Sequence, residues 1–106
     1  MANPHAGEVA LWLDGRRHVL KLTLGALAEL EAALEADTLV ALVERFEAGR
    51  FSTRDVLALI VAGLRGGGWD GTAEDLRCAE IRGGPVEAAR VAALLLARAF
   101  ALPGEA

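Results

Sequence analysis

The fold class is decided by the stretch EVALWLDGRRHVLKLTLGALAELEAAL, residues 8–34. In its first half, apolar residues alternate with other residues, which is the period of a strand with one buried face. From Leu24 onward the apolar residues recur three and four apart, which is the period of an amphipathic helix. Asp14-Gly15 separates two alternating segments and is a frequent turn between paired strands. The stretch therefore predicts a β-hairpin that leads directly into a helix.

The hairpin is expected to have one apolar face, and two connections preserve it. That face would hold Val9, Leu11, Leu13, Leu20 and Leu22. A two-residue turn at Asp14-Gly15 and a four-residue loop ending at Arg17 differ by two residues in register, so both leave the faces unchanged. We favour the longer loop, because it pairs Leu11 with Leu20 and leaves Arg16 in solvent. The shorter turn would instead place Leu13 opposite Arg16.

Five helices are predicted to follow the hairpin. Thr23, Thr38, the Ser52–Asp55 capping box and Thr72 mark four helix starts, and Pro85 suits the first turn of the last helix. Gly49 and Gly66 mark two helix ends. The predicted helices span residues 24–35, 38–48, 52–66, 72–81 and 85–101.

These elements predict a small α+β protein in which an N-terminal β-hairpin packs on a bundle of about five helices. A length of 106 residues corresponds to a single domain. Within it we expect a disordered segment at 1–7, the hairpin at 8–23, the helical part at 24–102 and a short tail at 103–106. Two strands alone would be marginally stable, so the helices must cover one face of the hairpin.

Composition excludes several classes of function. The net charge of −4 disfavours direct binding to nucleic acid, which requires clustered Lys and Arg. Apolar runs are shorter than the ~20 residues of a membrane span, so we expect no membrane insertion. The first residues lack a secretory signal, and Cys78 has no second cysteine with which to form an internal disulfide. The expected location is therefore a reducing cytoplasm.

Chemistry-bearing residues form no recognisable constellation, so the protein is not expected to be an enzyme. Gly66-Gly67-Gly68 lacks the Lys-Ser/Thr of a phosphate-binding loop. The two histidines and Cys78 show no metal-ligand spacing. Cys78 is interpreted as a small buried apolar residue rather than a nucleophile. We therefore predict no catalytic residue, no cofactor and no metal.

The last helix carries more apolar residues than one face accommodates, because three consecutive leucines at 94–96 span about 200° of its circumference. One intramolecular stripe would contain Val86, Ala89, Ala93, Leu96 and Phe100. Val91, Leu95 and Leu102 would then pack either on another part of the chain or on a second protein. Both alternatives stay open here.

Two tryptophans complete the list of candidate partner contacts. Trp12 lies on the hairpin face opposite Leu11 and could be covered by the stem of Arg17. Trp69 lies in the glycine-rich joint and could fold back onto the core. Because aromatic residues are enriched at binding hot spots, either could contact a partner instead. The hypothetical partner-binding set is Trp12, Trp69, Val91, Leu95 and Leu102.

Several segments resemble the gene transfer agent tail-protein family of alphaproteobacteria, which is grouped with phage tail assembly chaperones. They are MANP at 1–4, GEVA at 7–10, DGR at 14–16 and LTLGALAELEAAL at 22–34. Later similarities are LVAL at 39–42, RF at 45–46, GRFSTRD at 49–55 and AGLRG at 62–66. The resemblance covers most of the chain; its most specific part is 22–34, and the C-terminal third matches by pattern alone.

The resemblance implies a non-enzymatic tail assembly chaperone that binds the tape-measure protein, the major tail protein or both. Such chaperones coat long hydrophobic helices of the tape-measure protein before the tube polymerises. The alternatives are a minor structural component retained in the particle and a small protein-binding adaptor; self-association is also left open. The helix-rich pattern disfavours a tail-tube subunit, whose architecture relies on β-sheets that join between neighbours.

Overall fold

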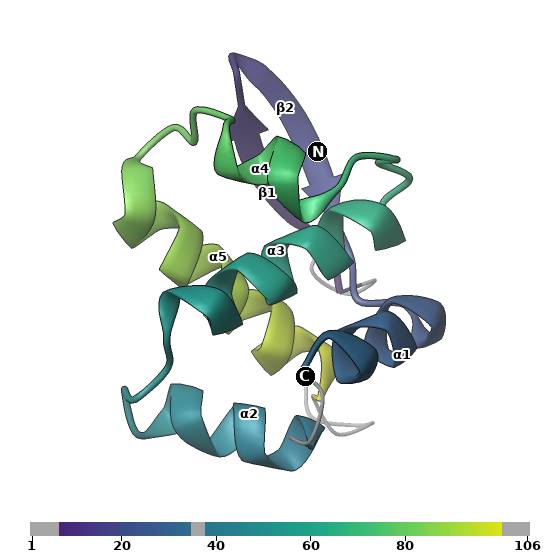
Figure 1. Ribbon diagram of the computed structural model, residues 1–106, viewed down its shortest axis with the longest axis vertical. Coiled ribbons are helices and arrows are strands. Elements are labelled where there is room, and N and C mark those ends of the chain that lie inside the picture. The colour runs from purple at the N-terminus through teal and green to yellow at the C-terminus, as the bar shows by residue number, and fades with distance from the viewer. Residues whose placement is uncertain (1–6, 35–37, 101–106) are drawn as a thin grey trace.

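The hairpin and the helices are arranged in the predicted order in the computed structural model, which describes residues 7–34 and 38–100 (Figure 1). Strands β1 (Val9–Leu13) and β2 (Arg16–Leu20) form an antiparallel sheet. The helices are α1 (Leu24–Ala33), α2 (Leu39–Glu47), α3 (Thr53–Gly66), α4 (Ala73–Arg77) and α5 (Gly84–Ala99). The predicted α+β class, an N-terminal hairpin followed by five helices, is confirmed. The expectations for residues 1–6 and 101–106 lie outside the described residues.

The hairpin turn is the shorter of the two considered, so the preferred four-residue loop was wrong. Leu13 pairs with Arg16, and Leu11 pairs with His18 rather than Leu20. Asp14 and Gly15 have φ values of 49° and 79°. Two successive positive φ values twist the chain in the same sense as the strands, which is why Asp-Gly favours this tight turn. The predicted apolar face is confirmed, with Val9, Leu11, Leu13 and Leu20 all buried.

Both edges of the hairpin lie against other parts of the chain. Along β1, the Arg82 amide donates to Trp12 O at 3.1 Å, and the Asp14 amide donates to Glu80 O at 2.9 Å. Along β2, the edge meets the end of α3, where the Lys21 amide donates to Gly63 O at 2.9 Å. These bonds occupy part of the β1 edge and the end of the β2 edge.

The central helix is α3, which packs against α1, α4, α5 and β2 (Figure 1). Its Leu59, Ile60 and Leu64 are at most 1% exposed. Hydrophobic residues from the hairpin and the other helices close around them, including Leu11, Leu20, Leu30, Leu42, Leu76, Val91 and Leu95. The helices thus supply the second layer that a two-stranded sheet requires.

Helix starts agree with the predicted caps. The side chains of Thr23, Thr38, Ser52 and Thr72 each accept a hydrogen bond from a backbone amide of the helix that follows. Both α3 and α4 have complete capping boxes. However, α4 ends at Arg77 instead of Ile81, because residues 80–82 are drawn into pairing with β1, where Leu13 forms an isolated bridge with Ile81.

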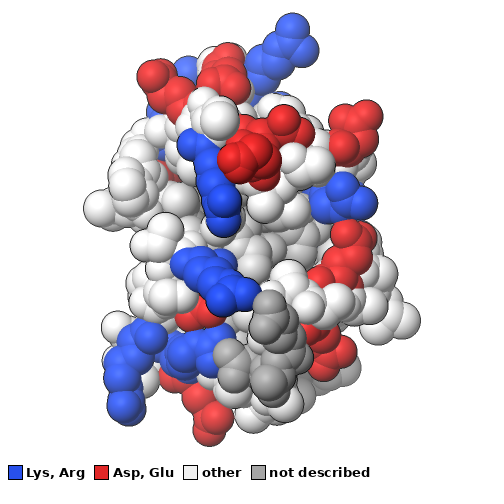
Figure 2. Space-filling model, in the orientation of Figure 1, with Lys and Arg blue, Asp and Glu red and all other residues white. Residues whose placement is uncertain are grey.

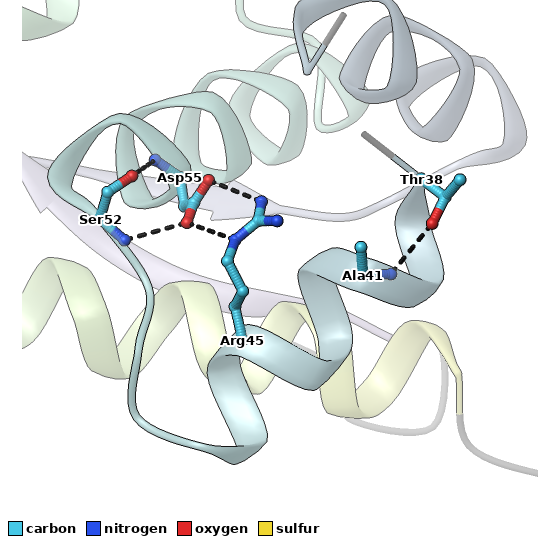
Figure 3. Close-up of polar contacts among 5 residues, drawn as sticks. All are labelled: Thr38, Ala41, Arg45, Ser52 and Asp55. Carbon is cyan, nitrogen blue, oxygen red and sulfur yellow. Dashed lines mark hydrogen bonds and ion pairs between the residues drawn. The ribbon is translucent and has the colours of Figure 1, made fainter. Parts of the chain in front are cut away.

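A buried ion pair joins α2 to the start of α3 (Figure 3). Arg45 donates from Nε to Asp55 Oδ2 at 3.0 Å and from Nη2 to Oδ1 at 2.9 Å. The Ser52 amide donates to Oδ2 at 2.9 Å, so the carboxylate also completes the capping box. Burial raises the pKa of Asp55, but the hydrogen bonds and charge of Arg45, together with Ser52, outweigh it and lower the pKa below its ordinary value.

The Asp55 pair should make stability depend on pH. Because the pKa is lower in the folded state than in the unfolded state, the pair stabilises the protein above the ordinary pKa of about 3.9, and this contribution is lost as the pH falls through the folded value. We expect Asp55→Asn to cost about 3 kcal/mol at neutral pH. Urea unfolding between neutral and acidic pH measures both effects. Asp75→Asn, at the exposed capping box of α4, is the control and should cost only about 1 kcal/mol.

Candidate protein-interaction surface

The described residues assemble no chemical centre. Within residues 7–34 and 38–100, no group of three or more His, Cys, Asp or Glu side chains could hold a metal ion. Cys78 is exposed at the end of α4, so its interpretation as a buried apolar residue was wrong. Across those same residues, no helix combines the length and hydrophobicity needed to span a bilayer. The search for a functional site therefore turns to surfaces that could contact another protein.

On α5, the structure contradicts most of the predicted intramolecular stripe, because Val86, Ala93 and Phe100 are exposed, although Leu96 is buried as predicted. Val91 and Leu95 are 0% and 1% exposed, whereas Val86 and Phe100 are 81% and 44% exposed. The inward-facing residues are Ala88, Val91, Ala92, Leu95 and Leu96. Val91 and Leu95 thus pack within the chain, the first of the two alternatives, and neither is available at the surface of this structure. Leu102 lies outside the described residues.

A glycine on α3 explains why Leu95 faces inward. A Cβ atom on Gly63 would lie 2.8 Å from Leu95 Cδ1 and 3.2 Å from Leu20 Cβ. The missing side chain therefore creates the space that Leu95 fills between α3 and β2. This fit depends on three elements meeting at one point, so the spacing of apolar residues along α5 did not reveal it.

Both tryptophans are half-buried by contacts within the chain. The guanidinium carbon of Arg82 lies 4.1 Å from the ring centroid of Trp12, so Arg82 covers this ring, where Arg17 was the expected partner. Trp69 packs on the core, and a Cβ atom on Gly71 would lie within 2.1 Å of its ring. Partner contact by the remaining exposed surface of Trp12 and Trp69 stays a prediction.

A concave surface lies beside α3. We name it the α3–α5 groove; its volume is about 720 Å³. It is lined by Phe51, Ser52, Thr53, Arg54, Val56, Leu57, Ile60, Leu76, Arg77, Ala79, Ile81, Gly84, Pro85, Ala88 and Ala89. Most of this lining is apolar, and it comes from α3, α4 and the first turns of α5, which are far apart in sequence.

A second hollow, the α1–α3 groove, lies between α1, α3 and the start of α4 and has a volume of about 380 Å³. Arg54, Leu57 and Arg77 line both grooves. Leu57 and Val61 of α3 are half-buried and line these hollows. The grooves therefore give α3 an outward stripe of apolar residues in addition to its buried face.

Charge is distributed unevenly around this surface. The chain has 15 acidic and 11 basic residues, and among residues 7–34 and 38–100 the charged side chains that line the α3–α5 groove are Arg54 and Arg77. In the α1–α3 groove, Arg65 donates to Glu29 at 2.7 Å. Figure 2 shows this face of the molecule, where atoms of uncharged residues lie among both basic and acidic side chains. The described lining of the α3–α5 groove is thus mainly apolar.

A small helix-rich domain with two apolar grooves has the features of a protein that works through contacts with other proteins. The family model described as phage tail tube protein, GTA-gp10, matches residues 6–102. The chain belongs to this family of phage and gene transfer agent tail proteins. No curated protein and no solved structure matches the chain.

Family membership confirms the resemblance to gene transfer agent tail proteins, but the printed description names a tail tube protein and not a chaperone. The argument that the helix-rich pattern disfavours a tail-tube role therefore conflicts with the description of the matching family. The sheet formed by the described residues has two strands of five residues each, so this part of the chain offers no long strand edge. Tail association is established at the level of the family.

Proposed function

We propose that this protein is a non-enzymatic tail assembly chaperone that binds the tape-measure protein, the major tail protein or both. The observation that carries the proposal is the apolar surface along α3, formed by the α3–α5 and α1–α3 grooves. A chaperone of this kind needs apolar area to cover a client's hydrophobic helices. It also needs to stay in solution with them, which a net charge of −4 favours.

The location of the grooves supports temporary rather than permanent contact. They lie on the outside of an already closed core, in which Leu59, Ile60 and Leu64 are buried without any partner. The chain therefore does not need its client in order to fold, and release of the client would leave an intact domain. A permanent subunit more often buries a larger and more hydrophobic interface.

A structural role in the finished tail is the second candidate, and the family description favours it. A tube subunit that joins its neighbours through β-sheets needs free strand edges. Here the β1 edge binds residues 80–82, and the β2 edge meets the end of α3. A structural role would therefore use the helical surfaces instead.

Co-expression with the tape-measure protein from the same genome tests the proposal. We expect affinity capture and light scattering to give a soluble complex with several copies of this chain, because one domain covers only a short part of a long helix. Expressed alone, the tape-measure protein should aggregate. Failure to form a complex, with aggregation unchanged, would contradict the chaperone proposal for this client; the major tail protein would then be tested in the same way.

Quantitative mass spectrometry of purified particles separates the two candidates. A chaperone should be abundant in cells during assembly and strongly depleted from particles, relative to the major tail protein. A stoichiometric amount in washed particles would instead support the structural role. A known structural tail protein serves as the internal standard for recovery.

A further inference from the structure

We infer that copies of this chain associate head to tail, with the outer side of α2 on one copy lying against the outer face of the hairpin on the next. The surface on the hairpin, named the hairpin face, consists of Trp12, Arg17, Val19 and Arg82; the surface on α2, named the α2 stripe, consists of Val40, Glu44 and Glu47. The inference goes beyond the proposed function, because a contact between copies needs no client.

The hairpin face places an aromatic ring between two cations. Trp12 pairs with Arg17 across the hairpin, and on its other side the Arg82 amide donates to Trp12 O, so the three residues form a row across the strands. Their side chains lie on the face opposite the buried Leu11 and Leu13, since successive residues of a strand alternate. The guanidinium carbon of Arg82 lies 4.1 Å from the centroid of the Trp12 ring.

Both guanidinium groups of this row are accessible to a ligand. Arg17 and Arg82 are exposed, and within residues 7–34 and 38–100 neither side chain takes part in a hydrogen bond or an ion pair. A guanidinium stacked on an aromatic ring keeps its N–H groups for a carboxylate. Asp14 and Glu80 lie one row closer to the turn, where the Glu80 amide donates to Asp14 Oδ1 at 2.9 Å. The row itself is therefore cationic and favours an acidic partner.

The α2 stripe has the opposite charge. Val40, Glu44 and Glu47 are spaced four and three residues apart, so they lie along one side of the helix, away from the buried Leu42. Val40 is 68% exposed, which is unusual for a large apolar side chain in this protein. In the part of the chain that the structure describes, neither glutamate takes part in an ion pair or a side-chain hydrogen bond. The stripe therefore presents one apolar side chain and two unneutralised carboxylates.

The two surfaces match in length and in chemistry. The stripe rises about 10 Å from Val40 to Glu47, and two strand spacings of about 5 Å separate Arg17 from Arg82. A helix laid along the row brings carboxylates to the guanidinium groups and Val40 to the half-buried ring of Trp12. Hydrogen bonds between these charged groups are stronger than those between neutral groups. Because the surfaces are small, we expect weak association.

The positions of the two surfaces make the association open-ended. Figure 1 shows the hairpin and α2 toward opposite ends of the molecule. Each surface faces away from the core, so one copy can use both at once. A contact between two different surfaces is heterologous and adds copies in a chain or a ring, whereas a two-fold dimer pairs the same surface with itself.

Sedimentation velocity measures the association. We expect the average mass of the wild-type protein to exceed that of a dimer as its concentration rises from about 10 μM to about 1 mM. Arg17→Glu with Arg82→Glu should weaken association about tenfold or more. Arg77→Glu with Arg90→Glu changes the net charge equally outside both surfaces and should stay within about twofold of wild type at physiological salt. A monomeric wild-type protein, or equal losses in both variants, would overturn the inference.

Exchanging the charges gives a sharper comparison. Glu44→Arg with Glu47→Arg should also be monomeric, since its α2 stripe then meets a basic hairpin face. In an equal mixture with Arg17→Glu, Arg82→Glu protein, each surface meets the opposite charge on the other variant, so association should return. Circular dichroism checks that both variants are folded, and Arg17→Gln with Arg82→Gln replaces the charge reversal if that variant unfolds. A mixture of folded variants that stays monomeric would contradict the inference.

NMR spectra recorded on dilution locate the contact. The indole signal of Trp12 and the amide signals of Val40 and Glu44 should shift with concentration, and those of the groove residues Leu57 and Ile81 should not. Shifts at the groove residues instead would place the contact between copies on α3 and overturn the inference. A wild-type chain that forms the tape-measure complex but stays monomeric alone would also overturn it, while the proposed function would stand.

Discussion

Leu95→Glu is expected to unfold the domain. Leu95, on α5, is 1% exposed and packs between α3 and β2, where the absence of a side chain on Gly63 makes room for it. The substitution removes about 2–3 kcal/mol of apolar burial and places a carboxylate in the hydrophobic core, where a charge is costly to bury. A domain of this size is stable by only about 5–15 kcal/mol. The two costs together should therefore remove most of its free energy of unfolding.

Circular dichroism and thermal unfolding measure this result directly. We expect Leu95→Glu to lose its cooperative transition. Ala93→Glu adds the same charge to the exposed side of α5 and should change stability by only about 0.5 kcal/mol. A folded Leu95→Glu variant that no longer binds the tape-measure protein would restore the alternative in which Leu95 contacts a partner.

Gly66→Ala is expected to have the second largest effect, because the end of α3 touches the backbone of the hairpin. A Cβ atom on Gly66 would lie 1.9 Å from Lys21 O, and one on Gly67 would lie 1.9 Å from Val19 O. Neither carbonyl can rotate away as a side chain would, so α3 must separate from β2. We expect a loss of about 3 kcal/mol or more, the upper end for overpacked sites.

Gly25→Ala is the matched control for this substitution. Gly25 is exposed within α1, and the nearest atom to an added Cβ is Thr23 Oγ1 at 3.9 Å. Alanine should therefore stabilise the protein by up to about 1 kcal/mol through its higher helix propensity. Chemical denaturation of both variants gives the comparison. Similar stabilities for Gly66→Ala and Gly25→Ala would contradict the close approach of α3 to β2.

Local sequence features predicted most of the fold because their causes are local. Alternation placed Val9, Leu11 and Leu13 on one buried face, and the capping residues before α1 to α4 located the helix starts within a residue. The hairpin register was also encoded locally, in the twist preference of Asp14-Gly15. It was mispredicted because side-chain pairing was given more weight than turn geometry.

The candidate site was less predictable, because it depends on segments that are distant in sequence. The α3–α5 groove combines residues of α3 with Leu76, Ile81 and the start of α5. Leu57 and Val61 carry no local sign that they line a groove and not the core. Conversely, the sequence left Val91 and Leu95 as candidates for partner contact. Both are buried in the structure, and Leu95 fills the space beside Gly63.

The sequence by itself determined the α+β class, the helix starts and membership in a tail-protein family, because periodicity, caps and family motifs are properties of neighbouring residues. Only the tertiary structure decided which face of α5 is buried, where α4 ends and where the α3–α5 groove forms. The sequence shows how many apolar residues a helix carries and how they are spaced. Which of them are buried depends on the backbone that approaches, and here glycines on α3 set that approach.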